Sequence, residues 1–239
     1  MIKAVVTGHS RGLGAAVAAE LMARGIPVLG VARGHAQACE GMEQAVVDLG
    51  NGAALGAWLA GPALRSFLAG CDTALLVNNA GMVTPVGPLA GQDPLAVLAA
   101  ATLNVAAPLA LSAAFAQAAP QAERRILHIS SGAGRSAYPG WSVYCATKAA
   151  LDQHARAVAL DGDARVKCVS LAPGVIDTDM QAEIRATPDS KFPLRQRFVD
   201  LKEGGVLVAP RDCAVALVDC LLARGFGREP VSDLRSPRA

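Results

Sequence analysis

The sequence predicts an α/β fold, a doubly wound parallel sheet of seven strands with helices on both faces. Two observations predict it. Short apolar runs of strand length alternate with helical patterns along the chain, which is typical of βαβ units and a parallel sheet. The chain has 239 residues that are 52% hydrophobic but only 4% aromatic, so one domain can bury a large aliphatic core.

The predicted strands lie at residues 3–7, 27–31, 44–47, 73–78, 125–129, 165–171 and 230–234. Helical patterns fill most of the gaps between them. Residues 34–43 are an exception, since this short stretch contains two glycines and its helix is expected to be vestigial. No internal repeat or low-complexity linker divides the chain, so we expect a single domain over residues 1–239.

Charge and cysteine content exclude several classes of protein. The net charge is +2 and no basic stretch is interleaved with aromatic residues, so we expect no nucleic-acid partner. The cysteines form no C-x-x-C pair, which indicates neither a metal site nor a disulfide framework. Reduced thiols fit a cytoplasmic protein, and the N-terminal run MIKAVVTG reaches a glycine turn too soon for a signal peptide.

The stretch between Asp93 and Glu123 carries no formal charge and is long enough to span a bilayer. It is a weak insertion signal, because it is alanine-rich and polar residues or proline interrupt it: Thr102, Asn104, Pro108, Ser112 and Gln117. We therefore expect no membrane partner and a helix buried against the sheet. This helix, from Pro94, and one from Trp141 could also pair across a homodimer or homotetramer.

The first strand ends at Thr7 in the turn TGHSRGLG, which leads into the amphipathic run AAVAAELMARG. Its glycines, Gly8, Gly12 and Gly14, would let the backbone turn sharply and approach a pyrophosphate. The N-terminus of the helix would favour the negative charge of that group. A turn between the first strand and a helix is the context that such a dinucleotide motif requires. A plain glycine-rich turn is the alternative.

The second strand ends at Ala32 and Arg33, where an NAD-binding fold usually has an acidic residue for the ribose 2′-hydroxyl. Arg33 and Arg11 could instead bind a 2′-phosphate, so the sequence favours NADP(H) over NAD(H). Two ordinary surface arginines are the alternative. After the third strand, Asp48 and Leu49 are candidates for the adenine end, where Asp48 could bind the amino group or only stabilise its own turn.

Two further stretches carry candidate site residues. The turn Asn78-Asn79-Ala80-Gly81 places small residues and amides at the carboxyl edge of the sheet, where ligands of open α/β folds bind. Tyr144 and Lys148, four apart, share one face of a predicted helix. Because a free phenol has a pKa of about 10, Lys148 is expected to lower it, at about 1.4 kcal/mol per unit. The same spacing also occurs by chance on many helices.

Taken together, these motifs resemble the classical short-chain dehydrogenase/reductase family, whose fold is a single Rossmann domain. TGHSRGLG matches the family's T-G-x-x-x-G-x-G, NNAG is intact, and Ser131 precedes the Tyr144-x-x-x-Lys148 motif by the family's thirteen residues. The resemblance extends from about Ile2 to Met180. By position it favours Ser131 over Ser130 as the catalytic serine.

The resemblance implies a role for each matching residue. Catalysis would use Asn104, Ser131, Tyr144 and Lys148, with Tyr144 as general acid and Asn104 helping to hold a water; Asn104 could instead be a buried amide. The nicotinamide cofactor would be held by Thr7, Gly8, Ser10, Arg11, Gly12, Leu13, Gly14, Arg33, Asp48, Leu49, Asn79, Ala80, Gly81, Tyr144, Lys148, Pro173, Gly174, Ile176 and Thr178. Thr178 could also be a helix cap. No metal is implied.

Residues 133–141 and 179–203 should determine the substrate, and the second stretch is expected to form a lid over the cleft. It mixes apolar residues and arginines, which suit either a hydrophobic or an anionic small-molecule carbonyl compound. The ending GREPVSDLRSPRA lacks the family's glycine-rich strand and resembles the sepiapterin and benzil reductase branch. Carbonyl reduction is the leading function; an isomerase or dehydratase, or a non-catalytic NADP-binding regulator, stay open.

Overall fold

The computed structural model describes residues 1–35 and 41–236. Its centre is a seven-stranded sheet in which every strand is parallel to its neighbours, in the order β3-β2-β1-β4-β5-β6-β7. The strands are β1 (Ile2–Thr7), β2 (Val28–Ala32), β3 (Glu43–Val46), β4 (Thr73–Asn78), β5 (Glu123–Ile129), β6 (Val166–Ala172) and β7 (Val231–Asp233). The predicted sheet is confirmed, with strand ends displaced by at most two residues.

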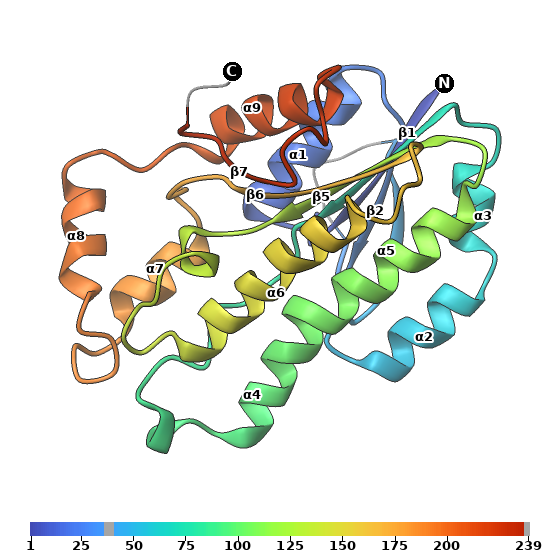
Figure 1. Ribbon diagram of the computed structural model, residues 1–239. Coiled ribbons are helices and arrows are strands. Elements are labelled where there is room, and N and C mark those ends of the chain that lie inside the picture. Colours follow the sequence, from blue (N-terminus) through green and yellow to red (C-terminus); the bar gives the residue numbers. More distant parts are fainter. Residues whose placement is uncertain (36–40, 237–239) are drawn as a thin grey trace.

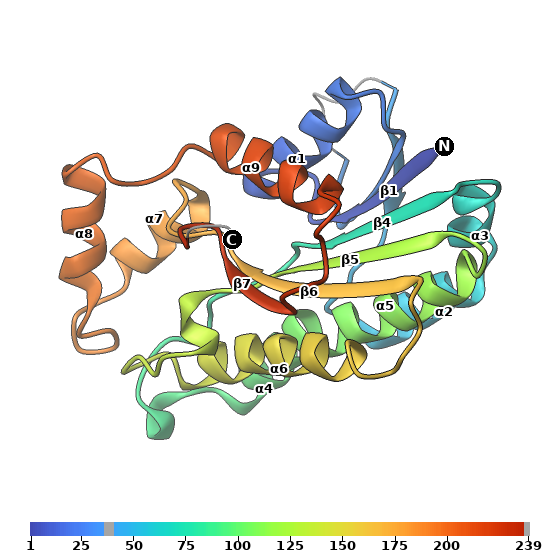
Figure 2. The ribbon, with the colours of Figure 1, turned by 45° about the horizontal axis from the view of Figure 1, so that its top comes forward.

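Helices cover both faces of the sheet (Figures 1 and 2). One face carries α1 (Gly12–Ala23) and α9 (Pro210–Leu222), and the other carries α2 (Gly52–Ala60), α3 (Ala63–Leu68), α4 (Pro94–Ala101), α5 (Ala107–Ala118) and α6 (Ser142–Val158). At one end of the sheet stand α7 (Asp179–Ala186) and α8 (Arg195–Glu203). The predicted vestigial helix at 34–43 falls largely on residues 36–40, outside the described residues.

The core forms because the central strands are apolar on both faces, as expected for a parallel sheet. In β1, Ala4 and Val6 face the cluster built with α1 and α9, whereas Val5 faces the cluster built with α2, α3 and α5. Local signals set the helix starts. The Asn51 side chain accepts hydrogen bonds from the Ala53 and Ala54 amides, each at 3.1 Å, and so caps α2.

The long apolar helix predicted after Asp93 runs from α4 through a π-helical turn (Thr102–Ala106) into α5. Its length and hydropathy would allow it to cross a membrane, a test that core helices of soluble proteins also pass. Its second half packs on the sheet through buried Leu111 and Phe115. Its first half leaves Leu95 and Leu98 exposed. Pairing of subunits through this surface stays a prediction.

The order of the strands reverses direction between β1 and β4, since the chain builds outward to β3 on one side and to β7 on the other. Loops after these two central strands therefore diverge at the carboxyl edge of the sheet and leave a crevice between them. The glycine-rich turn follows β1, and Asn79-Ala80-Gly81 follows β4. The topology thus brings two of the predicted motifs to one place.

Candidate active site

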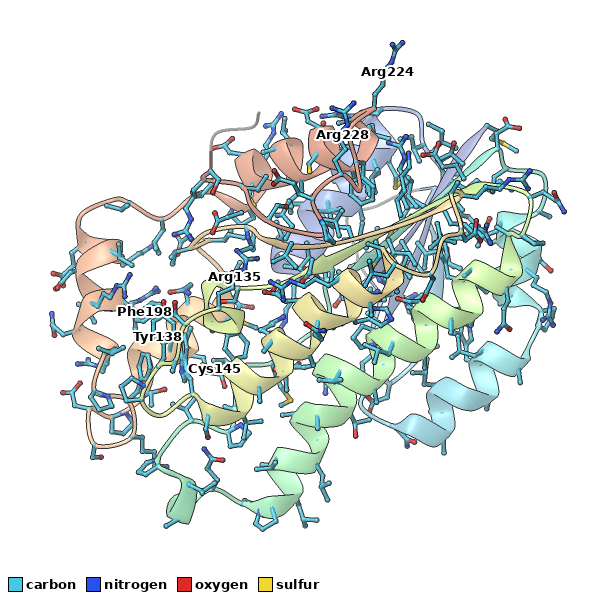
Figure 3. All side chains as sticks on the ribbon, in the orientation of Figure 1. Arg135, Tyr138, Cys145, Phe198, Arg224 and Arg228 are labelled. Atoms are coloured by element: carbon cyan, nitrogen blue, oxygen red, sulfur yellow. The ribbon has the colours of Figure 1, made fainter. Side chains whose placement is uncertain are left out.

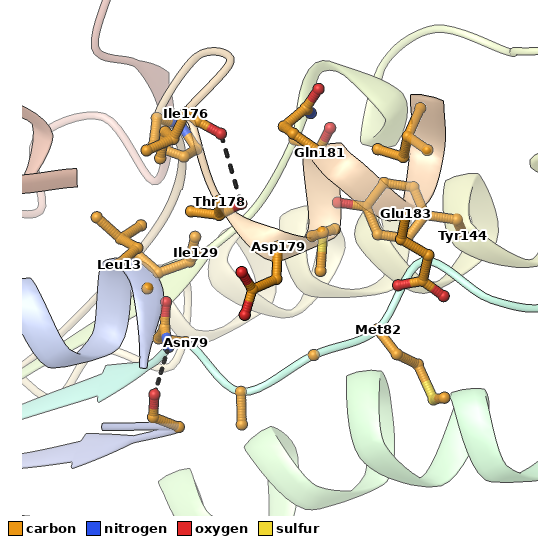
Figure 4. Close-up of a pocket in the computed structure, with 18 of the residues that line it drawn as sticks. Leu13, Asn79, Met82, Ile129, Tyr144, Ile176, Thr178, Asp179, Gln181 and Glu183 are labelled. Atoms are coloured by element: carbon orange, nitrogen blue, oxygen red, sulfur yellow. Dashed lines mark hydrogen bonds between the residues drawn. The ribbon is translucent and has the colours of Figure 1, made fainter. Parts of the chain in front are cut away.

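A cavity of about 840 Å³ opens at this carboxyl edge (Figure 4). Most of the predicted site residues line it: Gly8, Ser10, Arg11, Gly12, Leu13, Arg33, Asp48, Leu49, Asn79, Ala80, Gly81, Ser131, Tyr144, Lys148, Pro173, Gly174, Ile176 and Thr178. Thr7, Gly14 and Asn104 are not among its lining residues, and they support the cavity from behind. The size is typical of a cavity for a cofactor or small molecule.

The glycine loop has a shape that side chains would destroy. Gly8 and Gly12 have φ angles of +68° and +57°, which L-residues rarely adopt. A Cβ on Gly14 would lie 2.2 Å from the Gly8 carbonyl oxygen and 2.4 Å from the Asn79 side-chain nitrogen. The backbone therefore offers a bare cradle at the start of α1, which fits the pyrophosphate of a dinucleotide.

Thr7 joins the two loops of the cradle. Its hydroxyl oxygen accepts hydrogen bonds from the Asn79 and Ala80 amides at 2.9 and 3.0 Å. The Asn79 side chain in turn donates to the Thr7 carbonyl at 3.0 Å. Residues far apart in the chain are thus fixed against each other, which explains how Thr7 can support the cavity without lining it.

At the end where adenosine is expected, Arg33 is exposed and makes no ion pair with the residues that the structure describes. Asp48 accepts a hydrogen bond from the Gly50 amide at 2.9 Å and so stabilises its own turn while it lines the cavity. Arg11 pairs with Asp179 at 3.2 Å. Both partners are exposed, so this pair is weak and could open for a 2′-phosphate.

Tyr144 and Lys148 project from the first two turns of α6, and both are buried. Burial raises the pKa of Tyr144 to about 12, and the Ser131 side chain opposes this shift only in part. Burial also lowers the pKa of Lys148 to about 8, opposed by the charge of Asp152. The ammonium donates to the Ile129 carbonyl at 2.8 Å and lies 5.6 Å from the Tyr144 ring centroid.

The expected lowering of the Tyr144 pKa by Lys148 is therefore wrong for this structure. The physical reason is desolvation, which penalises the phenolate more than the neighbouring groups stabilise it. A phenol with this pKa is a protonated group at neutral pH. It therefore has a proton to give, although burial makes it a weaker acid than a free phenol.

The two serines after β5 both line the cavity, but their hydroxyl groups have different hydrogen-bond partners. Ser131 lines the cavity, and its hydroxyl accepts a hydrogen bond from the Ala133 amide at 3.2 Å. The Ser130 hydroxyl points the other way and bonds to the carboxylate of Asp152 at 2.7 Å. The choice of Ser131 as the catalytic serine stays a prediction, and the bond of Ser130 to Asp152 favours it.

Asn104 lies in the π-helical turn, and such turns are frequent at functional sites. Its side-chain oxygen accepts from the Met82 amide at 2.9 Å. Its side-chain nitrogen donates to the Met82 carbonyl at 2.8 Å and to the Thr147 hydroxyl at 3.2 Å. Since these protein partners occupy the side chain, Asn104 would have to hold a relay water through its main chain.

The loop after β6 closes the far end of the cavity. Gly174 has a φ of +88°, and the side chain of Arg235 packs against its Cα. Thr178 occupies the N-cap position of α7 but makes no capping bond with its side chain; its hydroxyl lies 3.4 Å from the Ile176 carbonyl (Figure 4). The hydroxyl is therefore not committed to the helix.

The predicted lid, residues 179–203, contains α7 and α8. Phe192 stacks on Trp141 with ring centroids 4.6 Å apart, and Phe198 lies 5.4 Å from the same indole. Tyr138 belongs to the same apolar cluster, and its ring centroid lies 5.5 Å from that of Trp141; Tyr138 and Phe198 are labelled in Figure 3. Sequence reasoning singled out the segment but not this aromatic packing, for which the aromatic residues at 138, 141, 192 and 198 were the available signal.

One group of potential metal ligands lies among the described residues, behind the cavity: His128, His154 and Cys168. Its two histidines already have hydrogen-bond partners. His128 contacts Asn78 at 3.1 Å through Nδ1 and His154 at 3.0 Å through Nε2. Burial raises the pKa of Cys168 to about 12, which disfavours the thiolate that a metal needs.

Buried His128 is expected to make stability depend on pH. Burial, with charge on His154 and Lys148, lowers its pKa from 6.5 to about 3. Below pH 6.5 the histidine takes up a proton in the unfolded chain but stays neutral in the folded protein. The free energy of unfolding is therefore highest above pH 6.5 and decreases as the pH falls from there. Between pH 7 and pH 5 the loss should be about 2 kcal/mol, measurable by urea unfolding. The variant His128→Asn should lose this part of the dependence; parallel curves for both proteins would contradict the assignment.

Comparisons with known proteins agree with this site. A family model described as short chain dehydrogenase matches residues 67–189. Over 243 residues the chain is 33% identical to benzil reductase ((S)-benzoin forming) of Bacillus subtilis (strain 168), with 97% of each chain covered. It is 32% identical over 244 residues to sepiapterin reductase of Xenopus laevis, with 93% of this chain and 91% of that protein covered.

Among solved structures, a short-chain dehydrogenase/reductase from Burkholderia vietnamiensis is 46% identical, with a TM-score of 0.71 and coverage of 99% of this chain and 98% of that one. The predicted resemblance to the sepiapterin and benzil reductase branch is confirmed by the two curated relatives. The chain belongs to the short-chain dehydrogenase/reductase family, oxidoreductases that use a nicotinamide cofactor to act on carbonyl and alcohol groups.

Proposed function

We propose that this protein is an NADPH-dependent reductase that converts ketones, in particular vicinal diketones, to alcohols. The observation that carries the proposal is that Ser131, Tyr144 and Lys148 line the same cavity as the glycine loop. An acid for the substrate oxygen and a cradle for the cofactor thus share one space. We also propose that the protein acts in the cytoplasm.

The chain's own residues would hold NADPH along the crevice. The bare backbone around Gly8, Gly12 and Gly14 would receive the pyrophosphate, and Arg33 with Arg11 the 2′-phosphate. Ile176 and Thr178 would contact the nicotinamide end. When bound, the cofactor supplies a hydride to the carbonyl carbon of the substrate.

Three side chains would manage the proton and the developing charge. Tyr144, protonated at neutral pH because its pKa is about 12, would donate its hydroxyl proton to the substrate oxygen. Ser131 would donate a hydrogen bond to the same oxygen and hold it in place. Lys148, with a pKa of about 8, is charged at neutral pH and would stabilise the phenolate that remains.

The residues on the substrate side of the cavity suit the binding of an apolar carbonyl compound, preferably one with an aryl group. Tyr138, Trp141 and Phe198 line it, together with Met180 and Ile184 from the lid. Flat rings can stack on such walls. The two curated relatives are named for benzil, benzoin and sepiapterin, which supports the choice of vicinal diketones as the first compounds to test.

The test follows NADPH and NADH oxidation by the purified protein with benzil, aliphatic vicinal diketones, simple ketones and quinones. We expect turnover of at least one diketone with NADPH and formation of one alcohol per NADPH oxidised. Product formation without NADPH consumption would instead identify an isomerase or dehydratase. Tight NADPH binding without turnover on the whole panel would favour a regulator.

The double substitution Arg11→Ala and Arg33→Ala is expected to narrow the preference for NADPH over NADH by about ten- to hundredfold, since a charge-assisted hydrogen bond contributes roughly 1.5 to 3 kcal/mol. The ratio of kcat/KM for the two cofactors measures it. The control is Arg24→Ala, which removes an arginine just after the end of α1 that pairs with Glu20 and Asp219. An unchanged ratio in the double variant would rule out the phosphate contact.

A further inference from the structure

A buried carboxylate lies directly behind the catalytic residues. Asp152 is on α6, one turn after Lys148, and only 1% of it is exposed to solvent. Burial of an ionised carboxylate is costly unless hydrogen bonds and a cation compensate it. The partners of Asp152 therefore indicate what it does.

Those partners come from three other parts of the chain. One carboxylate oxygen accepts from the Ser130 hydroxyl at 2.7 Å and from the Ser170 hydroxyl on β6 at 2.6 Å. The other accepts from Arg135 Nε at 3.1 Å. Arg135 also donates to the Ser232 carbonyl on β7 at 2.8 Å. A single side chain thus ties α6 to the loop that carries Ser131 and to the edge of the sheet.

The loop approaches α6 as closely as its backbone permits. A Cβ on Gly134 would lie 3.0 Å from the Lys148 carbonyl carbon and 3.1 Å from an Asp152 carboxylate oxygen. Ser130 and Arg135, both bound to Asp152, flank Ser131 and the short turn Gly132–Gly134 that follows it. The contacts that fix the loop therefore enclose the serine.

We propose that Asp152 is a positioning residue of the active site, which holds the Ser131 loop against α6 so that the Ser131 hydroxyl and the Lys148 ammonium keep their places around Tyr144. This inference rests on the proposed carbonyl reduction. Asp152 does not line the cavity, so it acts through its partners and not on the substrate.

Its charge acts on Lys148 as well. The titratable groups near Lys148 are Tyr144 and Asp152 on α6, His128 on β5 and, beyond Asp152, Arg135. With pKa values of about 12 and 3, Tyr144 and His128 are neutral near pH 8. Asp152 raises the pKa of Lys148 against burial, so loss of its charge should lower that pKa and loss of Arg135 should raise it.

The experiment compares Asp152→Asn with the wild type in reduction of the best substrate from pH 6 to pH 10. We expect kcat to fall about tenfold or more, because small misplacements of catalytic groups are costly. The KM for NADPH should stay within about twofold. The alkaline limb of the kcat profile should move to lower pH. Asp161→Asn, an exposed aspartate beyond the end of α6, removes the same charge and should behave as wild type.

A second variant covers the case in which Asp152→Asn does not fold. Arg135→Gln changes a partly exposed side chain, and it should also lower kcat but move the alkaline limb to higher pH. Opposite movements of the limb would not arise from a merely structural role. The inference would be overturned if both variants kept the wild-type kcat. It would also be overturned if kcat fell but the alkaline limb of its pH profile did not move. A wild type that reduces no carbonyl compound would instead refute the proposed function.

Discussion

Replacement of Tyr144 by phenylalanine is expected to lower kcat by about 10² to 10⁴, the range that general acid catalysis contributes. The variant loses the hydroxyl that would protonate the substrate oxygen. It keeps the ring, which packs edge-on against Trp141 with centroids 5.3 Å apart. Cofactor affinity should therefore stay within about twofold, and steady-state kinetics with an NADPH titration would separate the two effects.

The matched control is Tyr138→Phe, which makes the same change at the other tyrosine of the chain. Tyr138 lines the same cavity, but it has no part in the proton transfer proposed for Ser131, Tyr144 and Lys148. We expect its kcat within a few-fold of wild type. Near wild-type turnover in Tyr144→Phe would remove this tyrosine from the mechanism, and an equal loss of kcat in both variants would show that Tyr144 has no special role as proton donor.

The sheet could be predicted because each strand has a local cause. The runs AVV in β1 and ALLV in β4 are apolar on both faces, a pattern that fits only a strand buried between layers of helices. Strand ends were less certain because they depend on pairing. For example, β2 ends at Ala32 because Ala32 pairs with Val46 on β3. These two residues are too far apart in the sequence for a local pattern to predict their pairing.

The cofactor motifs could be placed for a topological reason. Turns that follow parallel strands gather at one edge of the sheet, so a glycine turn after β1 and an Asn-Ala-Gly turn after β4 had to be neighbours. The bond from Asn79 to Thr7 is the structural result. Both serines after β5 lie at the cavity, but they differ in their partners, because the Ser130 hydroxyl is bound to the buried carboxylate of Asp152.

What the sequence could not provide was burial. The spacing of Tyr144 and Lys148 predicted a cation beside a phenol, but the direction of the pKa depends on how much water reaches the pair. The Asp152 network shows the same limit. Asp152 was visible as the residue one turn after Lys148, whereas its partners Ser170 and Arg135 come from other elements, and no local pattern joins them.

Gly14→Ala is expected to abolish measurable NADPH binding and to destabilise the fold by about 1 to 3 kcal/mol, the usual cost of overpacking. The added Cβ would lie 2.2 Å from the Gly8 carbonyl oxygen and 2.4 Å from the Asn79 side-chain nitrogen. Neither can move freely, because Gly8 belongs to the turn after β1 and Asn79 is bound to Thr7. Relief of the clash must displace α1 from the loop and so deform the cradle.

Gly56→Ala is the matched control, since it adds the same methyl group to a helix at a position with no atom within 4 Å. It should stabilise the protein by about 0.5 to 1 kcal/mol, through helix propensity and a less flexible unfolded chain, and leave NADPH binding unchanged. Urea unfolding gives the stability of each variant, and NADPH titration gives the cofactor affinity of each. If Gly14→Ala bound NADPH as tightly as Gly56→Ala, the close approach of α1 to the loop would not form the pyrophosphate site, and the cofactor would have to lie elsewhere in the cavity.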